Sequence, residues 1–130
     1  MGAQVADVVI IEDGKVLLVQ QRKESAKGLW SYPGGGVEDG ETLEEAVVRG
    51  VIEELGVELI DPVPFKKYSI TTPRGPLEIH TFTGNIGDQE ITLKADELMN
   101  YGWFNIDELK SKPDLRSDLV LQQAKDAIDT

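Results

Sequence analysis

Residues 33–57 read PGGGVEDGETLEEAVVRGVIEELGV, and this stretch decides the fold. It begins with a proline that is followed by three consecutive glycines, Gly34, Gly35 and Gly36. Glycine reaches backbone conformations that are closed to other residues, and it lets a ligand or metal ion approach the main chain. We therefore predict a glycine-rich turn that exposes backbone carbonyl and amide groups directly before a helix.

The helix should begin immediately after Thr42. Thr42 and Glu45 have the spacing of a capping box, in which each side chain accepts a hydrogen bond from a backbone amide at the helix start. Apolar residues then recur at helical spacing and predict one inward face: Leu43, Ala46, Val47, Val51 and Leu55. Gly56 suits the end of the helix, where a left-handed backbone is common.

Acidic residues gather near the far end of this helix. Glu53 and Glu54 follow one turn after Arg49, so the two carboxylates and the guanidinium share one region of the helix surface. Adjacent carboxylates repel each other, and a hard divalent cation such as Mg²⁺ relieves that repulsion. Because Mg²⁺ prefers oxygen ligands, including substrate phosphate, this region is a candidate metal and phosphate site.

The spacing of these residues resembles the Nudix box of the Nudix (MutT-like) hydrolases. Five residues separate Gly35 from Glu41, and seven separate Glu41 from Arg49. The end of the box is matched by Glu53, Glu54, Gly56 and Val57. Residues 30–34, which read WSYPG, also resemble the aromatic, proline and glycine lead-in of that family.

The resemblance implies a fold and an activity. The expected fold is the Nudix fold, an α/β (α+β) class α/β/α sandwich with a mixed β-sheet, in a single domain over residues 1–130 with its box at about 35–57. The expected activity is that of a pyrophosphohydrolase, in which water attacks phosphorus and cleaves a nucleoside diphosphate linked to another moiety. The expected cofactor is Mg²⁺, with Mn²⁺ as a second candidate.

The resemblance also implies roles for the residues of the box. Glu53 and Glu54 are expected to be catalytic metal ligands, helped by the Gly34 carbonyl. Arg49 is expected to take part in catalysis by orienting these carboxylates through an ion pair. Glu41 is expected to support these metal ligands without contacting the metal ion itself.

Residues outside the box complete the predicted site. Glu97, six residues before Trp103, matches a loop acid that in some MutT-like enzymes enters the metal site or takes a proton from water, so we predict it as metal ligand and general base. Gly34 and Gly35 are predicted to contact substrate. Arg22 is predicted to contact a phosphate or the base of the substrate.

One position departs from the box. The family has a glutamate directly after the arginine, which commonly ligates metal or acts as general base, and this chain has Gly50 there. A glycine within a helix costs about 1 kcal/mol relative to alanine, so helix stability does not explain it. Two functions stay open: a hydrolase whose base is Glu97, Glu53 or a metal-bound hydroxide, and a catalytically weakened Nudix-fold module that binds nucleotide or regulates.

Composition restricts the partners. The chain has 130 residues, with 24 acidic against 13 basic side chains and a formal net charge of -11. This charge disfavours binding to nucleic-acid polymers and anionic membranes. A small nucleotide can still bind when a divalent cation reverses the sign of the local charge. The absence of cysteine excludes disulfides and thiolate sites. No long apolar run is present, so we expect a soluble cytoplasmic protein, and the resemblance implies a homodimer.

The remainder of the chain predicts a sheet and two further helical segments. Strands are predicted where branched and aromatic residues gather: residues 5–11, 15–19, 65–71, 77–86 and 101–104. Asp13-Gly14 indicates a hairpin between the first two strands, and residues 73–76 indicate another turn. Residues 61–64 contain two prolines and should interrupt regular secondary structure. A helical turn is expected at 107–109, and a final helix from Asp114 or Ser117 to Ile128.

Two further residues are functional candidates by their type or position. His80 is the single histidine, and with no second histidine or cysteine nearby a structural role is favoured. Pro73 lies sixteen residues after the box, where a proline marks some ADP-ribose-cleaving relatives, although a turn proline is the favoured interpretation.

Overall fold

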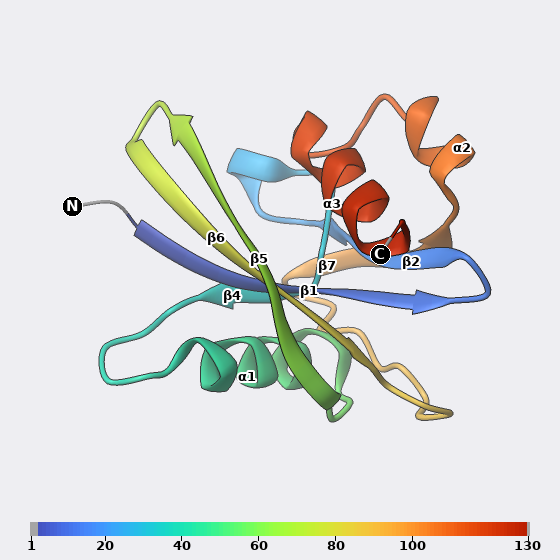
Figure 1. The fold of residues 1–130 in the computed structure, drawn as a ribbon, viewed down its shortest axis with the longest axis horizontal. Helices are drawn as coiled ribbons and strands as arrows, with labels where there is room; N and C mark the ends of the chain where they lie inside the picture. Colours follow the sequence, from blue (N-terminus) through green and yellow to red (C-terminus); the bar gives the residue numbers. More distant parts are fainter. Residues whose placement is uncertain (1–2, 130) are drawn as a thin grey trace.

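The computed structural model describes residues 3–129, in which a seven-stranded mixed sheet lies between helices on both faces (Figure 1). Helix α1 (Leu43–Leu55) covers one face, and helices α2 (Ile106–Lys110) and α3 (Asp118–Ile128) lie over the other. The strands are β1 (Ala3–Glu12), β2 (Lys15–Gln21), β3 (Trp30–Ser31), β4 (Gly34–Gly36), β5 (Ile60–Thr72), β6 (Gly75–Asn85) and β7 (Leu98–Phe104). The predicted α/β/α sandwich with a mixed sheet is confirmed.

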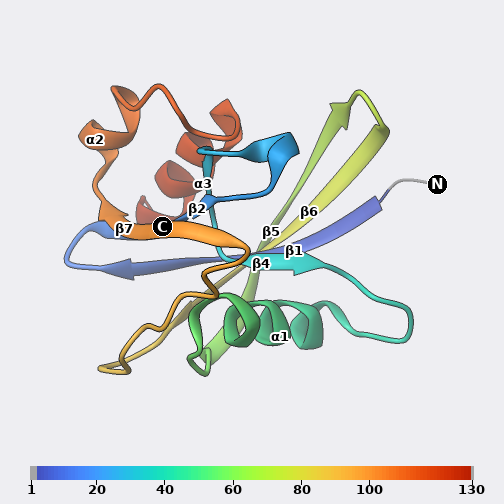
Figure 2. The same cartoon turned by 180° about the vertical axis from the view of Figure 1, so that it is seen from behind.

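Strand β1 organises the sheet. Its residues 3–10 pair in parallel with β6 along one edge. Along the other edge, residues 5–7 pair with β4 and residues 11–12 pair with β2, both antiparallel. The sheet therefore forks along β1, and Figure 2 shows β4 and the β2–β7 pair extending in different directions from it.

The predicted hairpins and terminal elements are confirmed. Asp13 and Gly14 both have positive φ angles, 52° and 75°, which the two-residue turn between antiparallel strands requires. Strands β5 and β6 also form an antiparallel hairpin, with Thr72 paired to Gly75 at its tip. The predicted strand at 101–104 lies within β7, and the two expected helical segments correspond to α2 and α3.

The predicted turn at residues 34–36 is wrong, because these glycines form strand β4. Gly34 has a φ of 147°, and a Cβ atom on it would collide with the Ala6 carbonyl oxygen and lie 2.7 Å from the Asp7 Cα atom. Only glycine allows β4 to lie so close to β1. The loop that leads into α1 comes later, at residues 37–42.

The predicted break at residues 61–64 is also wrong, because this segment belongs to β5. The pairing with β6 shifts register on both sides of Val63, and Asp61 has a φ of 51°. Strand β5 is the last in the sheet order, so a proline at its outer edge need not remove a ladder hydrogen bond. The strand therefore continues through its prolines, with two shifts of register in its pairing.

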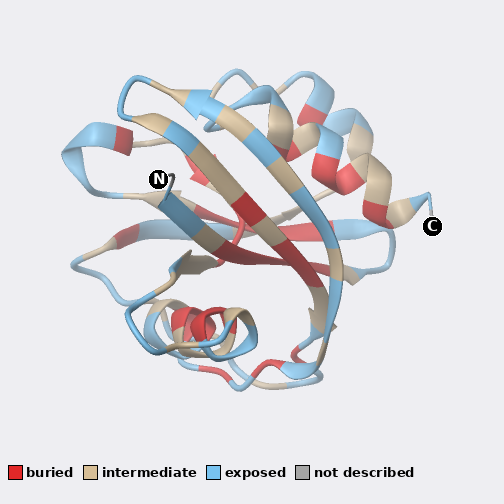
Figure 3. Ribbon diagram, turned by 60° about the vertical axis from the view of Figure 1, so that its left-hand side comes forward, coloured by how far each residue is buried: buried red, intermediate tan, exposed pale blue. Residues whose placement is uncertain are grey.

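Helix α1 forms as its sequence predicts. Thr42 and Glu45 make both hydrogen bonds of the capping box, and Gly56 ends the helix with a φ of 67°. The predicted inward face is buried against the sheet, with Leu43 only partly buried (Figure 3). Among the residues that the structure describes, no helix has the length and apolar character needed to span a membrane.

Replacing Leu55 by alanine should lower the free energy of unfolding by about 2–5 kcal/mol, because a fully buried leucine leaves a cavity. Ile52→Ala on the same helix is the matched control: Ile52 is 46% exposed, so the change should stay within about 0.5 kcal/mol. Urea denaturation followed by circular dichroism measures both, and equal losses would contradict the packing of α1.

Candidate active site

A cleft of about 540 Å³ opens at the fork in the sheet. Strand β1 contributes to it together with β4, the tip of the β5–β6 hairpin and the N-terminal end of α3. Polar and charged residues among those that line it include Asp7, Glu54, Arg116 and Gln123. The box helix and the opposite layer of the sandwich therefore contribute to one cavity.

Glu54 connects α1 to strand β4. Its Oε1 atom accepts a hydrogen bond of 2.8 Å from the Gly34 amide. The pKa of Glu54 is raised to about 7, mainly by burial and also by the charges of Glu97 and Glu53, while the Gly34 hydrogen bond and the charge of Lys23 oppose the increase. Three carboxylates are therefore close enough to repel one another at this end of the cleft.

Arg49 links the segment before α1 to the C-terminal part of the helix. Its guanidinium donates to both Glu41 carboxylate oxygens, at 2.7 and 3.0 Å, and to the Gly36 carbonyl at 2.8 Å. It also donates to Glu53 at 3.2 Å. These bonds lower the pKa of Glu41. Arg49 thus contacts carboxylates, in the geometry expected of an orienting residue.

Backbone hydrogen bonds bring Glu97 to the site. The Lys94 amide donates to the Glu54 carbonyl at 3.1 Å, and the Arg22 amide donates to the Glu97 carbonyl at 2.9 Å. The Glu97 carboxylate lies 3.6 Å from the Lys94 ammonium and 3.9 Å from that of Lys23. The loop before β7 is therefore fixed between α1 and the end of β2, which positions Glu97 beside Glu54.

The donor atoms at this site suit a hard cation. Within residues 3–129, no group of three or more histidine or acidic side chains is arranged so that it could hold a metal ion. Glu54 accepts from the Gly34 amide, Glu53 accepts from Arg49, and Glu97 lies 3.6 Å from the Lys94 ammonium. Glu54 offers carboxylate oxygens beside the Gly34 backbone, with Glu53 and Glu97 close enough to act on its charge, and oxygen is the ligand that Mg²⁺ prefers. Burial is the main cause of the raised pKa of Glu54, and a cation would relieve the smaller part that comes from repulsion by Glu97 and Glu53.

Gly50 has a packing role that the sequence did not reveal. It is buried in α1, and a Cβ atom there would lie 2.6 Å from the Gly34 carbonyl carbon and 2.8 Å from the carbonyl oxygen. Both atoms belong to the backbone of β4, which is held by β1. Helix stability does not explain this glycine, but the close contact between α1 and β4 does.

Of the predicted site residues, Gly34, Gly35 and Glu54 line the cleft, whereas Arg22, Arg49, Glu53 and Glu97 are not among the lining residues. Glu53 and Glu97 still lie close enough to Glu54 to raise its pKa, and Arg49 contacts Glu53. Arg22 is exposed. Sequence analysis missed Arg116, which lines the cleft just before α3 and carries no signal beyond its charge. It also missed Asp7, although an acid within an apolar strand was a signal that could have found it.

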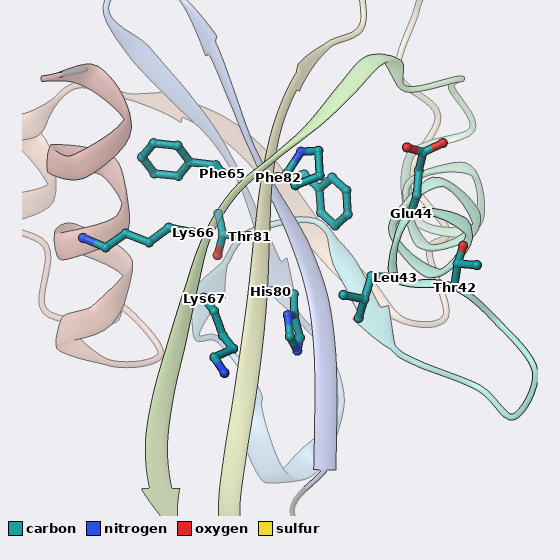
Figure 4. Close-up of a pocket in the computed structure, with 10 residues that line it drawn as sticks. Thr42, Leu43, Glu44, Phe65, Lys66, Lys67, His80, Thr81 and Phe82 are labelled. Atoms are coloured by element: carbon teal, nitrogen blue, oxygen red, sulfur yellow. The ribbon is translucent and has the colours of Figure 1, made fainter.

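A second cavity of about 450 Å³ lies between the start of α1 and strands β5 and β6. Figure 4 shows His80 and Leu43 facing it from β6 and α1. The His80 Nε2 atom lies 3.5 Å from a Glu78 carboxylate oxygen. None of the predicted catalytic residues is among those that line this cavity.

Comparison with known proteins gives the family. The NUDIX domain model matches residues 2–123, which include the whole box and the cleft. The chain belongs to the Nudix family.

Relatives of this chain are named as nudix hydrolases, pyrophosphohydrolases or pyrophosphatases. The CTP pyrophosphohydrolase of Escherichia coli (strain K12) is 33% identical over 125 residues, 93% of this chain and 89% of that protein. Putative nudix hydrolase 1 of Caenorhabditis elegans is 36% identical over 124 residues, 90% of this chain but 32% of that protein. The ADP-ribose pyrophosphatase of Methanocaldococcus jannaschii is 47% identical over 55 residues. The match covers 32% of the length of each of the last two relatives, and for the ADP-ribose pyrophosphatase it covers 42% of this chain.

Solved Nudix structures share the whole fold. The NUDIX hydrolase from Nitrosomonas europaea is 27% identical, with a TM-score of 0.83, over 98% of this chain and 88% of that chain. The E. coli ORF135 protein is 26% identical, with a TM-score of 0.77, over 98% of this chain and 91% of that chain. The forked sheet and its flanking helices are therefore those of the Nudix fold.

Replacing Gly50 by alanine should lower the free energy of unfolding by about 1–2 kcal/mol, because an overpacking cost near the upper end of about 1–3 kcal/mol exceeds the gain in helix propensity of about 1 kcal/mol. Gly36→Ala is the control, since a Cβ atom there meets nothing within 4 Å. Urea denaturation measures both. Gly50→Glu should also destabilise and should not raise turnover, so a large gain in turnover at unchanged stability would contradict this account.

The stability of the metal-free protein should fall as pH rises from 4.5 towards about 7, since Glu54 has a pKa of about 7 when folded against 4.5 ordinarily. In that window the folded state binds more protons than the unfolded state. The free energy of unfolding therefore falls by up to about 3 kcal/mol as the pH rises. Glu54→Gln should remove this component, while exposed Glu44→Gln should keep it. Urea titrations at pH 4.5, 6 and 8 measure it, and parallel profiles for Glu54→Gln and the parent protein would contradict the burial of this carboxyl.

Proposed function

We propose that this chain, as a single Nudix domain over residues 1–130, is a divalent-metal-dependent pyrophosphohydrolase that cleaves a nucleoside diphosphate linked to another moiety. The observation that carries the proposal is the Glu54 carboxylate, which accepts from the Gly34 amide in the lining of a cleft of about 540 Å³, with Glu53 and Glu97 close enough to act on its charge. The hydrolase names of relatives, including the E. coli CTP pyrophosphohydrolase, support the same reaction class.

The three carboxylates and the Gly34 carbonyl would hold Mg²⁺, with Mn²⁺ as a second candidate. When bound, the cation supplies charge neutralisation at the phosphoryl oxygens and a lowered pKa for water. Strand β4 would hold the phosphates, since Gly34 and Gly35 line the cleft and have no side chain to exclude a ligand.

The chain's own residues would orient the substrate and move the proton. Arg49 holds Glu53 at 3.2 Å and so fixes one carboxylate of the site. Glu97 would accept a proton from the attacking water, because Gly50 has no side chain to do so. Its side chain is 31% exposed, so water reaches it. Arg22, at the end of β2, stays a candidate for contact with an outer phosphate, because its amide is bonded to Glu97.

A second function is a nucleotide-binding or regulatory module with weak turnover, which the loss of the box acid at Gly50 favours. The two functions differ in one measurable way. Both bind nucleotide in the cleft, but only the hydrolase releases products.

The test is a panel of nucleoside triphosphates, dinucleoside polyphosphates, ADP-ribose and nucleotide sugars, incubated with Mg²⁺ or Mn²⁺ at neutral pH. We expect phosphate-containing products from at least one nucleotide, and their loss in EDTA. Glu97→Gln should lower kcat by about 10²–10⁴-fold with little change in KM, the usual contribution of a general base.

Glu90→Gln is the matched control for this variant, because Glu90 is an exposed acid in the same connection between β6 and β7. It should leave kcat unchanged. Nucleotide binding without product release across the panel would favour the binding module over the hydrolase. A Glu97→Gln variant with full kcat would remove Glu97 from the role of base.

A further inference from the structure

Three buried polar residues form a closed hydrogen-bond network in the layer between the sheet and α3. Asp7, Thr81 and Gln123 are 8%, 2% and 2% exposed. The Thr81 hydroxyl donates to Asp7 Oδ1 at 2.7 Å, and the Gln123 amide donates to Asp7 Oδ2 at 3.0 Å and to the Thr81 oxygen at 2.8 Å. The three residues come from β1, β6 and α3, so the network joins distant parts of the chain.

The Asp7 carboxylate is costly where it lies. Burial raises its pKa to about 6, against hydrogen bonds from Gln123, Thr81 and its own backbone, and no lysine or arginine charge contributes to its stabilisation among the described residues. An apolar residue of similar size would avoid the desolvation of a buried charge. Packing alone therefore does not account for an acid at this position, and a buried acid with a perturbed pKa in a cleft is typical of a functional group.

Asp7 also retains the capacity to bind a ligand. An ionised carboxylate accepts at about four lone-pair positions, and Thr81, Gln123 and the backbone N–H of Asp7 itself use three of them, which leaves one for a ligand. Asp7 lines the cleft, whereas Thr81, which supports it from behind, does not. In the sheet Asp7 is paired with Gly34, so this acceptor lies next to the strand that carries the proposed phosphate site.

The walls around Asp7 suit a flat ring. The cleft is lined there by apolar side chains from three elements, among them Val5, Ile79 and Val120. Tyr32 also lines the cleft, with its hydroxyl donating to the Val120 carbonyl at 2.7 Å. Apolar walls with a small number of polar groups are the usual form of a small-molecule site.

We propose that Asp7 is the specificity-determining residue of this cleft and selects a nucleobase that carries an exocyclic amino group. The carboxylate accepts hydrogen bonds from the amino group, and it repels the carbonyl oxygen that uracil or hypoxanthine presents at the same ring position. The inference rests on the proposed function for the phosphate end of the ligand, but base selection is a property of binding. It can therefore be measured without catalysis.

The test is isothermal titration calorimetry of the metal-free protein in EDTA at pH 8, with two matched pairs: CMP against UMP, and AMP against IMP. We expect the amino member of at least one pair to bind about tenfold or more tightly than its carbonyl partner, because one hydrogen bond is replaced by a repulsive contact. Equal binding within both pairs, a preference for the carbonyl member, or no binding by any of the four would overturn the proposal.

Asp7→Asn should abolish or reverse this preference, since its amide can donate to a carbonyl. Asp118→Asn is the matched control: Asp118 is an exposed acid in the first turn of α3 that does not line the cleft, and it should keep the preference. A preference retained in Asp7→Asn would assign base selection to another residue and overturn the role of Asp7. Failure of the hydrolysis panel with a normal CMP or AMP preference would count against the proposed reaction and leave the base selection standing.

Discussion

The close contact of three backbones at Gly34 is the constraint on which the site depends. Strand β1 leaves no room for a side chain on one side of Gly34, and Gly50 of α1 approaches its carbonyl group on another. This proximity lets the Gly34 amide reach Glu54 at 2.8 Å. Sheet and box helix therefore meet without intervening side chains, which fixes the acids against a stretch of bare main chain.

The fork in the sheet converts this contact into a cavity. Because β1 gives one edge to β6 and shares the other between β4 and β2, the strands diverge and leave a cleft that α3 and the β5–β6 tip enclose. Acidic groups lie on both sides of this cleft. Arg49 fixes the acids at the outer end of the box, and Asp7 places a lone carboxylate on the opposite layer.

Local patterns predicted the local structure well. The capping box at Thr42, the left-handed Gly56 and the Asp13-Gly14 hairpin are short-range effects, and all are present. The glycine strand at residues 34–36 could not be predicted in this way, because it depends on a partner strand far away in sequence. The same holds for Gly50 and Asp7, whose roles come from contacts between layers. In the site, the spacing of the box identified the acids, whereas Arg116 required the fold.

The contact between Gly50 and Gly34 also constrains the evolution of this chain. Any residue other than glycine at position 50 brings a Cβ atom within 3.0 Å of three backbone atoms of Gly34. A glutamate at this position therefore requires the main chain of β4 to move away from α1. No change of side chain at position 34 can make that room, because the atoms in the way are backbone, so a mutational route back to the full box runs through the path of the strand.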